Sequence, residues 1–506
     1  MPLNLLRSSL WLLLLTVAAG GTLPSPSAAG PLTAGVAKVE ITDVDAGPVH
    51  DPLFVKALVL GDGTTTVAIV TVDAVAIAEI GTIRNDYLAT VRAAVQKESG
   101  IAPAHVLINA SHCHGRVCAD VAARTVQAIA EAARNRVPVT VGVGRGHEDR
   151  VMENRRLILK SGREADVRHA YSLPPDDEVA AVGPVDPEIG LLRLDRMDGR
   201  TLAVVYNFAC HPIQGVPDGG NTADMTGFAS KVLEDAFGNG CVALFVQGCG
   251  GDINPARYKD ISQPRDAEPL GKLLGLSALQ AARPIRCAEP ATLRVINETL
   301  SLPRCDNAER IAALEAEQLR LLKSLKGTSL NLKSFLALTL QQGVSNAFPS
   351  DVAGRYLHER ARGRDDLERL DAENRRNVEQ YRRNIYAMEE LTRLQTNLDL
   401  LKKHHARNVA AGSRTIDVEV VGLRLGEFVL VTFPGELTVQ IGLNIKQASP
   451  HPFTFVAGYT NGYIYYAPTA EQLRNVGGAQ EDSDCLLAPE WQALFEAKVA
   501  DVLKRL

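Results

Sequence analysis

The segment Val106–His114, V-L-I-N-A-S-H-C-H, places a short apolar run directly before a polar cluster that contains two histidines. Apolar runs of this kind are typical of buried strands in an α/β sheet, which predicts a strand over Val106–Ile108. Because side chains alternate along an extended backbone, His112 and His114 can project to the same side. Neutral imidazole is a common metal ligand, so this strand end is a candidate for half of a metal site. Histidines hydrogen-bonded at a sheet edge are the structural alternative.

The same arrangement, an apolar run followed by a polar side chain, recurs along the chain. The later examples are Leu202–Phe208 before His211, Phe428–Phe433 before Glu436, and Phe453–Ala457 before Tyr463. In open α/β sheets, ligands bind beyond the carboxyl ends of strands, where residues distant in sequence can meet. Two histidines and a carboxylate are a common catalytic zinc set that leaves a position for water. These patterns predict an α/β protein with a mixed-sheet catalytic core and favour a metal-dependent hydrolase.

Residues 307–412 differ from the rest of the chain, since charged residues dominate and apolar ones recur three or four positions apart. Leu391, Leu394 and Leu398 show this spacing, which is typical of a long amphipathic helix, and Asn307–Lys326 is predicted to form a second helix. We therefore expect a non-catalytic helical hairpin over 307–412, acting as a lid or contact surface. It is inserted into a catalytic domain formed by residues 30–306 and 413–506. His404 and His405 are expected to be solvated rather than metal ligands.

Composition and the first residues bound the partners and the location. The balance of 54 basic and 59 acidic residues, formally −5, gives no reason to expect nucleic acid or an anionic membrane as a partner. Arg7, the apolar run Leu10–Ala19 and the small residues after it predict a cleaved signal peptide over residues 1–29. An uncleaved anchor is the alternative. The protein is then secreted or periplasmic, and either soluble or in peripheral membrane contact, because no later stretch is apolar enough to span a bilayer. The oligomeric state stays open.

The eight cysteines allow more than one interpretation. Export permits disulfides, and Cys287 with Cys305 and Cys113 with Cys118 are candidate local pairs. Cys210 and Cys249 can equally be small buried residues. The chain contains no Cys-x-x-Cys spacing, which argues against a structural zinc knuckle.

Six motifs, taken in order, resemble the catalytic domain of the neutral/alkaline non-lysosomal ceramidases. They are Ser111–His114 (S-H-C-H), Asn154-Arg155, Asn207–Pro212 (N-F-A-C-H-P), Gly251–Pro255 (G-D-I-N-P), Pro434–Glu436 (P-G-E) and Asn461–Tyr463 (N-G-Y). The matching covers most of 34–290 and 416–475. The resemblance implies a zinc amidohydrolase that cleaves an N-acyl bond of ceramide or a similar N-acylated amphiphile with a zinc-activated water.

The resemblance also implies roles for individual residues. It implies zinc ligands at His112, His211, Glu436 and Tyr463. His114 would face the scissile amide as proton donor and acceptor, and Arg155 would lie near the polar end of the substrate. The Tyr463 oxygen would bind the metal or stabilise developing negative charge. Asp73 and Asp252 are expected to orient the ligand imidazoles.

The chain departs from the family pattern at several points. The family run H-T-H-S-G-P is H-C-H-G-R-V over His112–Val117, so the loop that shapes the pocket differs. Asn254 stands where the family has a serine once favoured as the nucleophile. A zinc mechanism does not need that serine. The helical insertion is an addition to the pattern, and the family's C-terminal immunoglobulin-like domain is not expected.

Two other functions stay open on the sequence. One is a metal-dependent esterase or deacetylase on another substrate, such as a modified glycan. The other is a non-catalytic binding protein on the same scaffold. A deep apolar groove beside the metal would favour the lipid substrate, while a shallow polar cleft would favour the esterase or deacetylase.

Overall fold

The computed structural model describes residues 30–167, 173–215, 220–258, 260, 262–289, 292–343, 352–475 and 479–506. The signal peptide predicted over residues 1–29 lies outside the described residues. The predicted α/β class with mixed sheets is confirmed. Within the described part of the chain, every helix is too short or too polar to cross a lipid bilayer.

The larger sheet has eight strands. In spatial order they are β12 (Val242–Gln247), β11 (Thr201–Phe208), β10 (Glu188–Arg196), β5 (Val137–His147), β1 (Thr33–Glu40), β2 (Phe54–Gly61), β3 (Thr66–Val72) and β4 (Val106–Ala110). β3 pairs with β4 in parallel, as β11 does with β12, and the other neighbours are antiparallel. Because both faces of this sheet are covered, most of its strands are apolar along much of their length rather than alternating.

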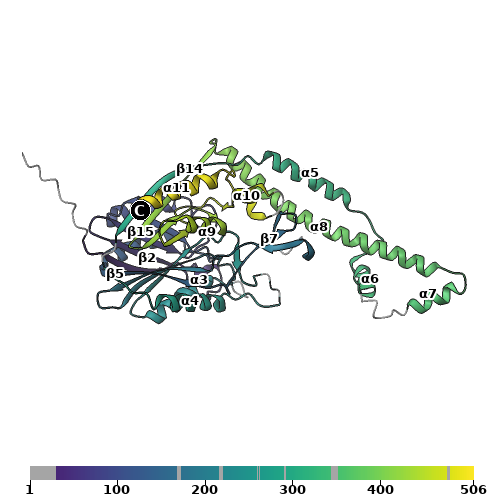
Figure 1. Ribbon diagram of the computed structural model, residues 1–506, viewed down its shortest axis with the longest axis horizontal. Coiled ribbons are helices and arrows are strands. Elements are labelled where there is room, and N and C mark those ends of the chain that lie inside the picture. The colour runs from purple at the N-terminus through teal and green to yellow at the C-terminus, as the bar shows by residue number, and fades with distance from the viewer. Residues whose placement is uncertain are drawn as a thin grey trace, which may run out of the picture.

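A second sheet lies against the first, and helices cover both outer faces. Its strands are β14 (Leu293–Pro303), β15 (Thr415–Leu425), β16 (Phe428–Thr432) and β18 (Phe453–Ala457). Leu58 and Ile69 of the first sheet share one buried cluster with Leu423 and Leu430 of the second. The first sheet is covered by α1 (Tyr87–Ser99), α2 (Val121–Arg134), α3 (Asp224–Phe237) and α4 (Glu268–Ala282), and the second by α9 (Val439–Ala448) and α11 (Trp491–Arg505). The core is therefore a four-layer helix–sheet–sheet–helix sandwich (Figure 1).

Buried polar side chains connect β12, at one edge of the eight-stranded sheet, to β2 and to β4 at the other edge. Lys56 Nζ on β2 donates to the Ala243 carbonyl on β12 at 2.9 Å. Asn109, on β4, accepts from the Gln247 N–H at 2.9 Å through Oδ1 and donates to the Gly458 carbonyl at 2.8 Å through Nδ2. These bonds bring the carboxyl ends of β4, β12 and β18 to one place, directly beside the polar cluster Ser111–His114.

The charged segment forms four helices. They are α5 (Ala308–Ser324), α6 (Leu332–Gly343), α7 (Val352–Arg360) and α8 (Asp366–Ala410). α5 packs along α8 as the predicted pair, through a cluster that includes Leu314, Leu321 and Leu398. The 45 residues of α8, at 1.5 Å each, make a helix about 70 Å long. This helix carries α6 and α7 away from the core, so the four helices α5 to α8 form an arm (Figure 1).

Several short elements near the strand ends lack a periodic sequence pattern, because two to five residues are too few to show one. They are β6 (Met152–Asn154), β7 (Arg156–Leu159), β8 (Glu164–Asp166), β9 (Val179–Val182), β13 (Ile253–Pro255), β17 (Glu436–Leu437), β19 (Tyr466–Ala467) and α10 (Ala470–Arg474). The last described element is α11.

The prediction that His404 is solvated is wrong. Its side chain is fully buried, and Nε2 lies 2.6 Å from Asp484 Oδ1, because the end of α8 packs on the core rather than ending in solvent. His405 keeps 31% of its side chain exposed and lies 3.5 Å from Asp306. Neither candidate disulfide is formed, since all eight cysteines lie in the described residues as free thiols.

Candidate metal centre

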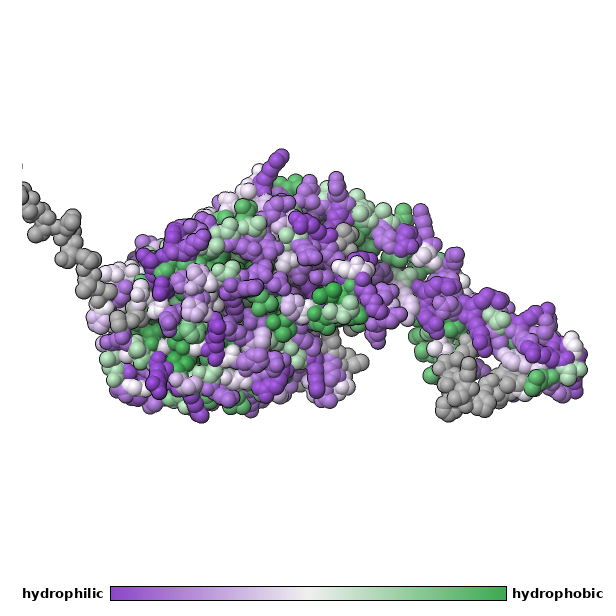
Figure 2. Space-filling model, viewed as in Figure 1, coloured by the Kyte–Doolittle hydropathy of each residue, from purple (hydrophilic) through white to green (hydrophobic). Residues whose placement is uncertain are grey.

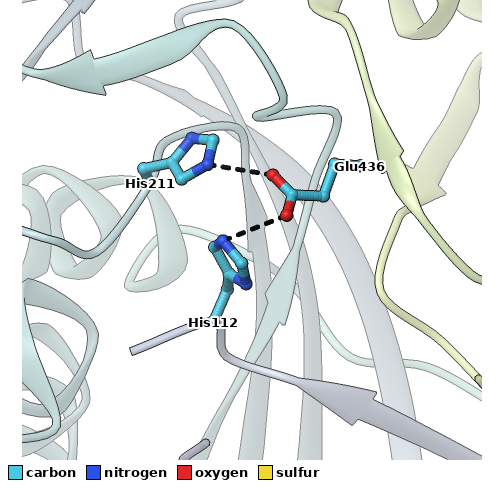
Figure 3. Close-up of side chains that lie close together, drawn as sticks. All are labelled: His112, His211 and Glu436. Atoms are coloured by element: carbon cyan, nitrogen blue, oxygen red, sulfur yellow. Dashed lines mark hydrogen bonds and ion pairs between the residues drawn. The ribbon is translucent and has the colours of Figure 1, made fainter. Parts of the chain in front are cut away.

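Three buried side chains from separate strand ends face one another (Figure 3). His112 follows β4, His211 follows β11, and Glu436 follows β16. His211 Nε2 lies 3.1 Å from Glu436 Oε2, and His112 Nε2 lies 3.6 Å from Oε1 of the same carboxylate. The candidate ligand atoms all lie within 4.8 Å of one another, so this group could hold a metal ion.

Backbone carbonyls fix both imidazole rings. His112 Nδ1 lies 2.5 Å from the Val75 carbonyl, and His211 Nδ1 lies 3.0 Å from the Ile253 carbonyl. Because a carbonyl only accepts, each Nδ1 carries the hydrogen, and a neutral ring then presents a lone pair on Nε2. Both Nε2 atoms point at Glu436, so three acceptors converge. A cation between them relieves this repulsion, and the donor set therefore fits a divalent metal.

Burial sets the charge states that this arrangement requires. It lowers the pKa of His112 to about 4, although the Glu436 carboxylate opposes the shift. Burial alone would raise the pKa of Glu436, but His112, His211 and the hydrogen bond from Tyr463 hold it well below its usual range. At neutral pH, His112 is therefore neutral and Glu436 is ionised, which are the forms that bind metals.

The backbone at the centre is locally strained. His112 has a φ of 69°, Tyr459 of 52° and Tyr465 of 64°, all in the left-handed region that non-glycine residues rarely occupy. Each such residue costs about 1–3 kcal/mol and persists only where the surrounding structure holds it. Their clustering beside the three candidate ligands is typical of a functional site.

Two tyrosines donate to the candidate carboxylate ligand. The Tyr463 hydroxyl donates to Glu436 Oε1, and the Tyr459 hydroxyl donates to Oε2 at 3.2 Å. Tyr463, predicted as a fourth ligand, therefore contacts the centre through the carboxylate. Tyr459 is not singled out by any motif, although it stands four residues earlier in the same G-Y-T-N-G-Y segment, and this repetition was the available signal.

Asp73 and Asp252 do not orient the imidazoles, contrary to the prediction, because the backbone carbonyls hold both rings. Asp73 Oδ2 accepts from the Phe54 N–H at 2.9 Å. Asp252 Oδ1 accepts from the Val439 N–H at 2.8 Å, at the first residue of α9. Both carboxylates thus secure the chain around the centre rather than its ligands.

Arg155 forms part of the wall of the centre and is almost entirely buried. Its Nε lies 2.6 Å from Glu481 Oε1, and Nη2 donates to the Gly251 carbonyl at 2.6 Å and to the Tyr466 hydroxyl at 3.2 Å. Asn254 accepts from Nη1 at 3.1 Å. Protein groups therefore hold the guanidinium in place. No motif singles out Glu481, because it lies beyond the last stretch that resembles the family.

The centre opens into a cavity of about 540 Å³. His114 lies exposed on its wall, with its ring centroid 5.7 Å from that of His112. Most of the lining residues have polar side chains, and the aliphatic ones are Val75, Ile80 and Ile213. The root of the arm contributes to the wall as well, since the cavity is also lined by Lys403 of α8.

A second, smaller cavity adjoins the first on the side of His114. It measures about 330 Å³ and shares Val75, Ile80 and His114 with the main cavity. Its remaining lining includes Ala74 and Ala76, so its walls are more apolar than those of the main cavity. The two cavities together present a polar chamber at the candidate metal ligands and an apolar branch beside it.

A carboxylate near the cavity gives a pH-dependent prediction. Asp51 accepts from the Thr222 hydroxyl and, at 3.1 Å, from the Ala223 N–H, and burial raises its pKa to about 6. A carboxyl whose pKa is raised by folding stabilises the protein below its unfolded pKa of about 4, and this contribution is lost as pH rises through about 6. We expect the free energy of unfolding of Asp51→Asn, relative to that of the natural chain, to rise by about 2 kcal/mol from pH 4 to pH 8, as measured by urea unfolding. The exposed Asp177→Asn variant should show no such rise. Absence of the rise in Asp51→Asn as well would contradict the raised pKa of Asp51.

The fold and the site define a class: a four-layer α/β protein with a candidate metal centre at its strand ends. The chain is similar to the neutral ceramidase from Pseudomonas aeruginosa, with a TM-score of 0.57 and 16% identity, over 94% of this chain and 75% of that one. It is similar to a ceramidase complexed with C2 over the same shares, with a TM-score of 0.58 and 16% identity. The resemblance drawn from the motifs is thus confirmed for the fold. No family model and no curated protein sequence matches the chain.

Proposed function

We propose that this protein is a zinc-dependent amidohydrolase that cleaves the N-acyl bond of ceramide or a similar N-acylated amphiphile. One observation carries the proposal: His112, His211 and Glu436 converge as three buried acceptors on a fold shared with ceramidases. Two histidines and one carboxylate are a common catalytic zinc set. The proposal includes Tyr463 as the fourth ligand.

Bound zinc would supply Lewis-acid activation of water and polarisation of the amide carbonyl at neutral pH. His114, on the cavity wall, takes a proton from the attacking water and delivers it to the departing amine, so that amide and water become carboxylate and amine. Burial raises the pKa of Tyr463, which keeps its hydroxyl protonated, and its one hydrogen can turn from Glu436 to a carbonyl oxygen that gains negative charge. Protein groups already occupy most N–H groups of the Arg155 guanidinium. Only its remaining N–H groups can therefore bind the polar end of the substrate.

The shape of the site bears on the substrate. The apolar branch beside His114 fits an acyl chain next to the candidate metal ligands, which supports the lipid substrate. The many polar side chains that line the main cavity favour a second candidate, a metal-dependent deacetylase or esterase acting on a modified glycan.

The test combines metal analysis with a substrate screen. Protein purified without added metal is expected to contain about one equivalent of zinc per chain. It should release fatty acid from short- and long-chain N-acyl sphingolipids. Release of acetate from acetylated sugars, without release from any N-acyl lipid, would replace the first candidate with the second. Zinc without hydrolysis of either class would favour the binding-protein alternative.

Asn254→Ala is expected to keep substantial activity. The side chain is fully buried, is not among the residues that line the main cavity, and contacts Arg155 through one hydrogen bond. Loss of such a bond costs about 1 kcal/mol, so kcat/KM should stay within about tenfold of the natural chain, and zinc content should not change. Complete loss of hydrolysis with zinc retained would show that this position takes part in the chemistry.

Export belongs to the proposal as well, because the sequence predicts a signal peptide over residues 1–29. N-terminal sequencing of protein recovered outside the producing cell is expected to begin between Gly20 and Gly30. A chain that starts at Met1 and stays inside would contradict it.

A further inference from the structure

The arm exposes more large apolar side chains than the core does. Seventeen large apolar side chains are exposed among the described residues, and ten of them lie in α5, α6, α7 or α8. The rest are scattered singly over the core, which is normal for a protein surface. Clustered exposed apolar residues instead mark a surface that binds something. The arm is thus where an unassigned interaction is to be sought.

Helix α6 concentrates these side chains in one stripe. Phe335 anchors the helix, since it is buried and stacks on Tyr381 of α8 with ring centroids 4.6 Å apart. Leu332, Leu336 and Leu340, spaced four residues apart, lie on a neighbouring face of the helix and are 58%, 51% and 74% exposed. Figure 2 shows hydrophobic surface on the arm where α6 lies, within otherwise hydrophilic surroundings. α6 is therefore an amphipathic helix whose apolar stripe has no cover among the described residues.

The end of the arm also differs from the whole chain in charge. Residues 326–364 contain six Lys or Arg against two Asp or Glu, a formal charge of +4, while the complete chain carries −5. Some of this charge is used locally, since Arg360 pairs with Glu368 of α8 and Arg364 lies 3.9 Å from Glu359. Lys333 is exposed on α6 itself, next to the leucine stripe. The overall charge gives no reason to expect an anionic membrane, but the charge of the arm does.

We propose that α6 docks the arm on an anionic lipid surface. A helix with an apolar stripe and basic neighbours lies in the plane of the lipid interface, with the leucines among the acyl chains and the cations at anionic headgroups. This inference deepens the proposed function, because a ceramide-like substrate resides in a bilayer. The root of α8 lines the main cavity through Lys403, and α6 packs on the same helix through Phe335 and Tyr381, so α8 links the docking helix to the site.

The experiment compares two triple variants of the full chain. Leu332→Gln/Leu336→Gln/Leu340→Gln removes the stripe, and Met197→Gln/Leu276→Gln/Leu494→Gln removes three exposed apolar side chains from the core as a matched control. Co-sedimentation is measured with vesicles of phosphatidylcholine alone and with vesicles that also contain phosphatidylglycerol. The natural chain and the control should bind the anionic vesicles, more weakly at high salt. The stripe variant should bind at least about tenfold more weakly.

Hydrolysis separates this inference from the proposed function. The stripe variant should cleave a water-soluble short-chain N-acyl substrate at the natural rate and lose activity only on ceramide embedded in vesicles. Equal vesicle binding by the natural chain and the stripe variant would overturn the docking proposal. A natural chain that forms a dimer, together with a stripe variant that is monomeric, would also overturn it, because the stripe would then be a contact between two copies. Absence of hydrolysis of every soluble substrate, with vesicle binding intact, would overturn the enzyme proposal alone.

Discussion

Replacing His211 with alanine is expected to abolish both the bound metal and the hydrolysis of N-acyl substrates. The imidazole supplies one of three buried acceptors, and His112 with Glu436 alone cannot hold the cation against water. Lewis-acid stabilisation of the transition state is worth several kcal/mol, so kcat/KM should fall by about a thousandfold or more. Metal content by mass spectrometry and fatty-acid release are measured on the same samples. His112→Ala should behave in the same way.

The matched control is His147→Ala, which removes a largely exposed imidazole from the end of β5 and should leave metal and activity unchanged. Without the cation, the buried Glu436 carboxylate still faces the remaining imidazole. The alanine variant should therefore be no more stable than the natural chain. Unchanged zinc in either His112→Ala or His211→Ala would refute the assignment of the metal centre, whatever the activity.

Glu481→Ala should be the most destabilising single change outside the metal centre. Glu481 is fully buried, and its Oε1 lies 2.6 Å from Arg155 Nε while Oε2 lies 3.6 Å from Arg156. Removing one partner leaves a guanidinium buried without its counter-charge, which costs about 3–5 kcal/mol. Urea unfolding should report this loss, and activity should fall too, because Arg155 forms part of the cavity wall.

Two further variants distinguish the effect of losing the buried counter-charge from the effect of shortening a side chain. The exposed Glu427→Ala, in the turn between β15 and β16, should change stability by less than about 0.5 kcal/mol. Arg155→Met combined with Glu481→Leu removes both charges and should recover much of the stability lost in Glu481→Ala, without recovering activity. Equal stability of the Glu481→Ala and Glu427→Ala variants would show that the ion pair contributes nothing.

The sequence predicts the elements that have a long period or a short motif. The amphipathic spacing in the arm predicts α8, observed over Asp366–Ala410, and the apolar run at Val106 predicts β4. The same runs indicate where His112, His211 and Glu436 stand, because a polar side chain directly after a buried strand lies at the edge of the sheet. The sequence alone does not show that these three residues converge, because each of them is equally compatible with a structural role.

The sequence by itself determined the α/β class, the strand ends that carry the candidate ligands, and the two long amphipathic helices α5 and α8. These features follow from local periodicity, which any window of the chain displays. Only the tertiary structure decided that Asn109 joins three strand ends, that Tyr459 and Glu481 support the centre, and that His404 is buried. Each of these contacts joins residues too far apart in sequence for any single window to show, and whether two such groups meet depends on how the whole core packs.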